Sequence, residues 1–304
     1  MNLKSPIDRE SDVQHLRDIK VKEIVSLYKS FNIDVTKYFH DLEIISVFKC
    51  ERTNYEFYYP FNLEGDSAFY EHFQSFDWYY MPWKWEHKVT MQYINNGMNI
   101  LEVGCGHGAF LNKVSELYNL NDCVGLEINQ TALKISSKWK IVNQFVQDYE
   151  IDNKEKFDLV CSYQVLEHVS DVFQFITSKI NCLKPGGKLI ISLPNNESFL
   201  KNSNFCLNMP PHHMGKWDSN SLTALEKLFS INLIKLHYEE LQEYHIDSYI
   251  YSKYYAKYNR LFGKIVRKID RMTGKYNKLI KYVKTQKNNI IGHTILAVFE
   301  KKVS

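Results

Sequence analysis

The sequence lacks paired cysteines, long apolar runs and a secretion signal. Its six cysteines stand singly, and no two have the short spacing of a zinc knuckle or a redox pair. No stretch approaches the roughly eighteen apolar residues of a membrane-spanning helix, and the charged start MNLKSPIDRE has no apolar core. We therefore expect buried free thiols, no zinc site and a cytoplasmic protein.

The overall charge is small, and it is unevenly distributed. The formal net charge is +3, and the hydrophobic share of 44% and charged share of 24% are typical of a soluble globular protein and exclude a disordered chain. Twelve Lys or Arg and a single acid, Asp270, lie between Tyr251 and Asn289, so the rest of the chain carries about −8. The basic character is therefore local.

The chain divides into an N-terminal part and a longer second part. Residues 1–90 are rich in aromatic side chains, above all from Phe69 to His87, and their mixed periodicity predicts short helices and a β-ribbon. Residues 91–304 alternate strand and helix patterns, which predicts a parallel sheet covered by helices. Within this part, about 242–289 form a helical insertion whose apolar residues recur every three or four positions.

Seven strands can be marked in the second part. In order they are NILEVGC, CVGLEIN, NQFVQD, FDLVCSY, GKLIISLP, NLIKLHY and, after the insertion, GHTILAVFEK. Strands that alternate with helical patterns predict an α/β fold, in which ligands bind at the carboxyl ends of the strands.

The loop after the first strand carries the first chemical signal, LEVGCGHGA from Leu101 to Ala109. Its glycines allow a sharp turn and let a ligand approach the backbone closely. The run also fits a dinucleotide site with Ala109 in the last place, so NAD is an alternative. However, Glu102 stands two positions before the first glycine, where a carboxylate opposes a pyrophosphate and favours a cation such as S-adenosylmethionine.

Two further polar signals follow the next strands. Glu127 ends the second strand, 23 residues beyond Gly104, where its carboxylate can accept hydrogen bonds from both hydroxyls of a ribose. Gln147 and Asp148 come after the third strand, where a side-chain oxygen can accept from the amino group of adenine. A helix cap is the alternative role of Asp148.

These motifs, with LKPGGKLIISLPN and PPHHMGKWDSNSL, resemble the class I S-adenosylmethionine-dependent methyltransferases, in the branch of bacterial sugar- and polysaccharide-pathway and ubiquinone-pathway enzymes. The resemblance covers about Asn99 to Glu240 and the final strand. It implies a Rossmann-like seven-stranded sheet, mostly parallel with an antiparallel last strand, and S-adenosyl-L-methionine as cofactor. The cofactor-binding residues that it implies are Glu102, Gly104, Gly106 and Gly108 for the methionine part, Glu127 for the ribose, Asp148 for the adenine, and Ile128, Tyr163 and Gln164 as further contacts.

Methyl transfer to a hydroxyl group needs an aligned nucleophile and a base that removes its proton, and histidine has a suitable pKa. His212 and His213 follow two prolines beyond the carboxyl end of the fifth strand, so one of them is the first candidate for the base. His168, next to Glu167, is the second candidate. A structural role for this Glu-His pair is the alternative.

A divalent metal ion is another possibility for the same residues. Small-RNA 2′-O-methyltransferases of this fold bind an ion through Glu-x-x-Glu-His and a later histidine, and Glu167, His168 and His212 or His213 match most of that set. The first position here is Gln164, whose neutral amide is a poorer ligand for a hard cation than a carboxylate. We therefore predict no metal site.

The aromatic residues before the sheet are candidates for substrate binding. Tyr79, Tyr80, Trp83 and Trp85 are expected to form a lid, because aromatic faces stack on sugar rings and on adenine. Packing between the N-terminal part and the sheet is the alternative. Similar leaders in polysaccharide pathways sometimes begin with Cys-Pro-x-Cys, but Ser5-Pro6-Ile7-Asp8 stands there in this chain, so no zinc is expected.

The favoured function is O-methylation of a carbohydrate hydroxyl, in a nucleotide sugar, a lipid-linked sugar or a polysaccharide. A quinone-like phenol and an amino-sugar nitrogen are alternative acceptors, and a non-catalytic binding module is the alternative of a different class. The basic stretch at 251–289 is a solvated face, a site for phosphate groups of the acceptor, or a peripheral contact with the anionic inner membrane surface. Nucleic acid is not favoured as a partner, because no RNA-binding module accompanies that stretch.

Overall fold

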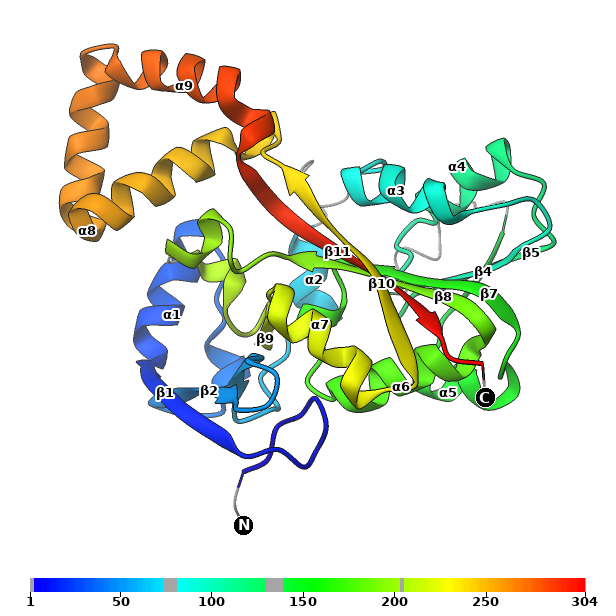
Figure 1. The fold of residues 1–304 in the computed structure, drawn as a ribbon. Helices are drawn as coiled ribbons and strands as arrows, with labels where there is room; N and C mark the ends of the chain where they lie inside the picture. Colours follow the sequence, from blue (N-terminus) through cyan, green and yellow to red (C-terminus); the bar gives the residue numbers. More distant parts are fainter. Residues whose placement is uncertain (1–2, 74–80, 130–138, 203–204, 304) are drawn as a thin grey trace.

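The computed structural model describes residues 3–73, 81–129, 139–202 and 205–303, without the side chains of 259–261. A seven-stranded sheet runs through its centre in the order β10-β11-β8-β7-β4-β5-β6 (Figure 1). The strands of this sheet are β4 (Asn99–Val103), β5 (Asp122–Leu126), β6 (Lys140–Val142), β7 (Phe157–Tyr163), β8 (Leu183–Pro194), β10 (Ile231–Glu240) and β11 (Ile291–Lys301).

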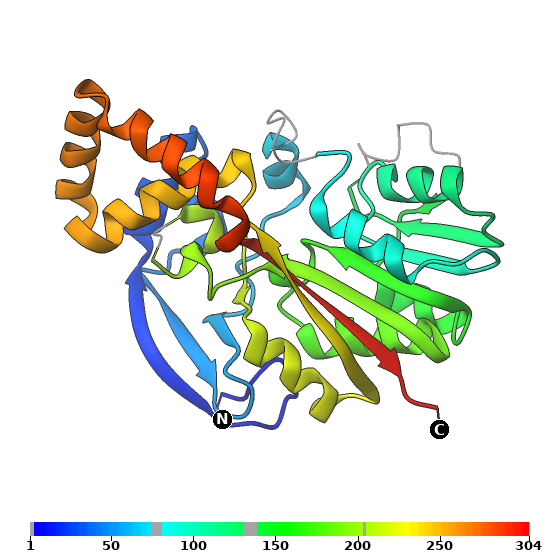
Figure 2. The same cartoon turned by 45° about the horizontal axis from the view of Figure 1, so that its top comes forward.

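The direction of the strands confirms the predicted fold class. Strands β6, β5, β4, β7 and β8 run parallel, and the last strand, β11, lies antiparallel between β8 and β10. Helices cover both faces of the sheet (Figures 1 and 2). They are α3 (Trp85–Thr90) and α4 (Ala109–Leu117) on one face and α5 (Val146–Tyr149), α6 (Val172–Cys182) and α7 (Ser219–Leu228) on the other.

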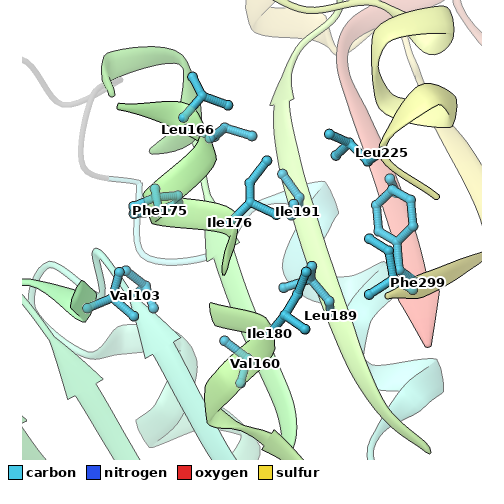
Figure 3. Packing of buried hydrophobic residues seen from close by; sticks show 14 of the residues in the cluster. Val103, Val160, Leu166, Phe175, Ile176, Ile180, Leu189, Ile191, Leu225 and Phe299 are labelled. Carbon is cyan, nitrogen blue, oxygen red and sulfur yellow. The ribbon is translucent and has the colours of Figure 1, made fainter. Parts of the chain in front are cut away.

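Alternation along the buried strands divides the core into two layers. Leu189 and Ile191 of β8 belong to the cluster that contains α6 and α7, whereas Ile190 packs in the cluster that contains α4. Figure 3 shows Phe175 and Ile176 of α6 in the layer that contains Leu189 and Ile191. Because both faces of the sheet are covered, its central strands are mostly apolar on both sides, as is typical of parallel sheets.

The predicted third strand, NQFVQD, is the one strand that sequence analysis placed wrongly. Strand β6 covers only Lys140–Val142, and helix α5 begins at Val146. As the edge strand, β6 pairs only with β5 over three residues, and the chain then turns at Asn143, whose side-chain amide donates to the carbonyl of Glu127. The turn therefore ends the strand before its apolar run is finished.

The N-terminal part shares a sheet and a core with the second part. Its second sheet has the order β1-β2-β3-β9, in which β9 comes from the chain after β8. The elements of this region are β1 (Val13–Lys20), α1 (Val21–Tyr28), β2 (Ile44–Cys50), β3 (Glu56–Tyr59), α2 (Ser67–Phe73) and β9 (Gly215–Lys216). Directly after β9, the fully buried Trp217 packs its ring 4.4 Å from the ring of Tyr55.

The helical insertion extends away from the rest of the molecule (Figure 1). It consists of α8 (Ile246–Met272) and α9 (Lys275–Gln286), separated at Gly274, whose φ of +73° is the left-handed conformation that favours glycine. No helix among the described residues is long and apolar enough to cross a membrane. All six cysteines are buried free thiols, as predicted.

The contact between Trp217 and Tyr55 predicts how strongly the two parts depend on each other. Trp217→Ala leaves a large cavity between the second sheet and the core, so we expect the free energy of unfolding to fall by about 3–5 kcal/mol. Tyr282→Ala is the matched control, because this aromatic side chain is 64% exposed on α9 and its loss should change stability by at most about 0.5 kcal/mol. Urea denaturation followed by circular dichroism measures both, and equal losses would contradict the account.

Candidate active site

A cavity of about 1700 Å³ opens at the carboxyl ends of β4, β5 and β7. This volume exceeds the roughly 300–1,000 Å³ of an ordinary ligand pocket, so the cavity has room for two ligands side by side. Its wall includes the loop after β4, the end of β5, the loop before α7 and the start of α8. It therefore lies where ligands of open α/β sheets bind.

The loop after β4 has the backbone conformation that its glycines predict. Gly104 and Gly106 line the cavity with φ values of +76° and +52°. A Cβ on Gly104 would lie 2.5 Å from Cγ2 of Val165, so a side chain at this position would be both strained and blocked. Gly108 is not part of the cavity wall, because it forms the N-cap of α4.

Two carboxyl groups meet at this loop. Glu102 is 4% exposed, and within the described residues its Oε2 accepts no hydrogen bond. Burial and the neighbouring Glu127 raise the pKa of Glu102 well above its usual range. Glu127 accepts hydrogen bonds at Oε2 from the Gly106 N–H and at Oε1 from the Asn129 N–H, both of 2.8 Å. The half-exposed Ile128 next to it also lines the cavity.

Of the two residues Gln147 and Asp148 that follow β6, it is Gln147 that faces the cavity, whereas the resemblance implied Asp148. Gln147 lines the cavity, and its buried Oε1 accepts no hydrogen bond within the described part of the chain. Asp148 is exposed to solvent and lies outside the cavity wall. The reason is that α5 begins at Val146, so successive side chains there point about 100° apart and only the first of the pair faces inward.

Tyr163 and Gln164, for which the resemblance implied cofactor contact, lie at the end of β7 and line the cavity. Tyr163 is buried, with its ring 4.8 Å from that of His87 and 5.1 Å from that of Phe110. Gln164 has a φ of +55°, and its N–H donates a hydrogen bond of 2.9 Å to the carbonyl of Ser192 on β8. The backbone therefore leaves the sheet sharply at this point.

The three candidate base histidines form one cluster in the cavity wall. One ring nitrogen from each of His168, His212 and His213 lies within 4.8 Å of the other two. Their Nδ1 atoms face acceptor oxygens, at 2.5 Å from the carbonyl of His212 for His168, at 2.8 Å from the carbonyl of Leu207 for His212, and at 3.2 Å from Oδ1 of Asn208 for His213. Since these oxygens cannot donate, Nδ1 of His212 and of His213 carries the proton and Nε2 the lone pair.

Burial keeps this cluster uncharged. It lowers the pKa of His168 to about 4, and together with the neighbouring histidines it lowers the pKa values of His212 and His213 well below the ordinary 6.5. Burial also raises the pKa of Glu167, whose Oε2 accepts no hydrogen bond among the described residues, to about 8. The site therefore holds neutral imidazoles beside a protonated carboxyl group at neutral pH.

Of the four residues of the predicted aromatic lid, the structure describes Trp83 and Trp85, and neither is among the residues that line the cavity. Tyr79 and Tyr80 lie outside the described residues. Trp83 and Trp85 are placed away from the large cavity, because their side chains pack into the hydrophobic cluster between α3 and α4. Trp83, for example, lies parallel to Phe110 with ring centroids 6.5 Å apart. Trp83 and Trp85 therefore pack between the N-terminal part and the sheet, which was the alternative to a lid.

Sequence analysis missed a second group of aromatic and polar side chains in the cavity. Tyr244 and His245, just before α8, and His293 of β11 line it, and the rings of the two histidines stack at 4.7 Å. No motif marks them, since the insertion separates them in the chain. Only the pairing of β10 with β11 brings them together.

Comparisons with known proteins agree with this geometry. A family model described as "Methyltransferase domain" matches residues 78–260, which is more than half of the chain. The chain is 30% identical over 144 residues to a mitochondrial ubiquinone biosynthesis O-methyltransferase of Dictyostelium discoideum, covering 40% of this chain and 44% of that protein. It is 27% identical to a probable S-adenosylmethionine-dependent methyltransferase of Mycolicibacterium smegmatis, covering 47% and 56%.

Among solved structures, the chain is similar to a SAM-dependent methyltransferase from Archaeoglobus fulgidus, with a TM-score of 0.47 and 20% identity over 71% of this chain and 92% of that one. The chain spans about half the length of the curated relatives that it matches. Because the family model covers the glycine loop and the parallel strands whose ends form the cavity, the protein belongs to the class I S-adenosylmethionine-dependent methyltransferases, and S-adenosyl-L-methionine is its cofactor.

Proposed function

We propose that this protein methylates a hydroxyl group of a small-molecule or glycan acceptor, and that the acceptor hydroxyl belongs to a carbohydrate. The observation that carries the proposal is the cluster of three neutral histidines in the cavity wall that also contains the glycine loop. A sugar hydroxyl is a poor nucleophile near neutral pH, so it needs a base that is uncharged there. When bound, the cofactor supplies an activated methyl group on a good leaving group.

The residues around the glycine loop fit the cofactor. The buried Oε2 of Glu102 needs a partner, and the amino group of the methionine part would provide one, because a cation beside a buried carboxyl group favours its ionised form. Both oxygens of Glu127 keep lone pairs for ribose hydroxyls after accepting their backbone hydrogen bonds. Gln147 takes over the role that sequence analysis gave to Asp148, since its Oε1 can accept from the adenine amino group.

The histidine cluster would act on the acceptor. Its Nδ1 hydrogen bonds fix the orientation of the rings, and His212 or His213 would accept the hydroxyl proton at Nε2. His168 packs its ring 4.6 Å from His212 and 5.0 Å from His213, so it supports their positions and is the second candidate for the base. Alignment of the acceptor next to the methyl group supplies the rest of the rate enhancement.

A quinone-like phenol is the second candidate acceptor. Relatives from Dictyostelium discoideum and Bradyrhizobium diazoefficiens are ubiquinone biosynthesis O-methyltransferases. The cavity wall also contains a group of apolar side chains, which suits an aromatic ring with a hydrophobic tail. Its apolar residues include Leu27, Phe31, Phe199, Leu200, Phe205 and Leu207.

The first prediction concerns the cofactor. We expect S-adenosylmethionine and its demethylated product to bind in the micromolar range, about −8 kcal/mol, and Glu127→Ala to weaken both by about tenfold or more. Asp148→Ala is the control, because this exposed side chain should leave the affinity unchanged. Isothermal titration calorimetry measures all three proteins. No heat with either ligand, combined with tight binding of NAD, would contradict the assignment.

The second prediction is that turnover survives metal chelation. Gln164 stands at the first position of the Glu-x-x-Glu-His metal-binding pattern, where the pattern has a carboxylate. In addition, the pKa of Glu167 is raised to about 8, which keeps its carboxyl group protonated at neutral pH. We therefore expect the initial rate of methyl transfer to be the same with and without EDTA. A loss of turnover that Mg²⁺ or Mn²⁺ restores would instead make Glu167, His168 and a later histidine metal ligands.

The third prediction tests the base. Replacing the correct one of His212 and His213 by Ala should lower kcat by roughly 10²–10⁴, with little change in cofactor affinity, because a general base acts in the transition state. The neutral imidazole is the active form, so activity falls as pH drops through its pKa. Since burial lowers that pKa, the acidic limb of the pH–rate profile should lie below 6.5.

This limb should vanish in the variant that lacks the base. If both single variants keep a kcat near that of the wild type and an intact acidic limb, neither histidine is the base. A rise in the KM for the acceptor without a change in kcat would show that the pair only shapes the cavity.

A further inference from the structure

We propose that the second half of α8 is a docking surface for an anionic lipid bilayer. We define this surface, called the α8 surface below, by the exposed side chains between Phe262 and Lys275. The proposal does not depend on which acceptor the active site takes. It rests on three features of the projection formed by α8 and α9. These are an exposed apolar stripe, the positive charge beside that stripe, and a set of contacts that fixes the orientation of the two helices.

The apolar stripe lies on one side of α8. Phe262, Ile265, Ile269 and Met272 are 64%, 56%, 52% and 80% exposed, and they follow one another at intervals of three, four and three residues. This spacing places them on a single helix face. Large apolar side chains that gather on the surface in this way indicate a binding surface rather than an ordinary solvated helix.

The first half of the same helix behaves differently. Ile246, Ile250 and Tyr254 are buried, with exposures of 3%, 1% and 8%, in a cluster with Phe199 and Leu200. The helix therefore uses its apolar residues as core near the sheet and presents them to the outside farther along. In the second half Val266 still packs against this cluster, whereas the exposed stripe does not belong to it.

Positive charge lies along one side of the stripe. The exposed residues Lys264, Lys268 and Arg271 lie on the same helix half, and Lys275 and Lys278 follow in α9. The single acid in this region, Asp270, accepts a hydrogen bond of 2.5 Å from the hydroxyl of Tyr254, so it is tied to the inner side of the projection. Apolar residues flanked by Lys and Arg are the pattern of helices that lie in the interface of anionic membranes.

A fixed framework presents this surface. Gly263 lies so close to the first half of α8 that a Cβ there would be 3.2 Å from the carbonyl oxygen of Tyr254, and Figure 1 shows the resulting change of direction. The Tyr276 hydroxyl of α9 donates to Asp247 at the start of α8 over 2.6 Å. The projection is thus closed on itself, and its outer face does not need to refold in order to bind.

Charge favours a bilayer over a second copy of this chain. Two α8 surfaces in contact would bring their lysine and arginine side chains together, and like charges in an interface oppose association. Anionic headgroups would neutralise the same charges while the apolar stripe enters the boundary between headgroups and acyl chains.

The active-site cavity reaches the same helix. Lys264 and Arg267 line it, and the guanidinium of Arg267 lies 4.7 Å from the centre of the Tyr251 ring, which also lines it. A bilayer on the α8 surface would therefore lie next to the cavity entrance. An acceptor that carries a lipid chain could then enter without leaving the membrane surface.

Vesicle co-sedimentation of the full chain tests the proposal. We expect binding to vesicles of phosphatidylcholine with phosphatidylglycerol, weaker binding to phosphatidylcholine alone, and weakening by salt, because salt screens the charges. The double variant Ile265→Ser/Ile269→Ser should lower binding about tenfold or more. Lys268→Glu/Lys278→Glu should lower binding to the anionic vesicles only.

The matched control is Leu117→Ser/Ile151→Ser, which changes two apolar residues of similar exposure, 52% and 66%, elsewhere on the surface. It should bind vesicles like the wild type, and all variants should keep the wild-type affinity for S-adenosylmethionine, which shows that they are folded. No binding of the wild type to anionic vesicles, or equal losses in the α8 variants and the control, would overturn the proposal. The proposal would also be overturned if the wild type is a dimer without vesicles and Ile265→Ser/Ile269→Ser makes it a monomer. The α8 surface would then bind a second copy of this chain.

Discussion

A hydrogen bond of 2.8 Å from the Gly106 N–H to Oε2 of Glu127 joins the loops that follow two neighbouring parallel strands. Strands β4 and β5 end at the same edge of the sheet, so the polar residues after them are forced together. Val165, which follows β7, leaves no space for a side chain at Gly104. The floor of the cavity thus depends on three strand ends in register, and a change in any of them would displace the carboxyl groups that face the cofactor.

The cavity separates two kinds of buried titratable groups. On the cofactor side, burial favours the neutral form of Glu102, and a bound cation would reverse that preference. On the acceptor side, burial keeps the histidines neutral and able to accept a proton. A cationic cofactor therefore suits the cofactor side, because it stabilises the carboxylate.

The sequence predicted the sheet, and most of the residues it proposed for the cofactor line the cavity, because glycines, apolar strands and strand-end acids are local patterns. It failed where the result depends on partners far away in the chain. The short edge strand β6 ends early because it pairs on one side only, and this shift exchanges Gln147 for Asp148. Trp83 and Trp85 have the composition of a lid, yet they are partly buried and pack against the hydrophobic cluster that contains α4. His245 and His293 could not be paired from the sequence, since the strand pairing across the insertion decides their contact.

A crystal structure of the protein with S-adenosylhomocysteine tests the central claim most directly, because that claim is about which ends of one cavity the cofactor and the base occupy. The account predicts the amino group of the ligand against Glu102, its ribose hydroxyls on Glu127 and its adenine near Gln147. The thioether sulfur should then face the open part of the cavity that His212 and His213 line. Electron density that places the ligand elsewhere, or that leaves these two histidines on the far side of the adenine, would contradict it.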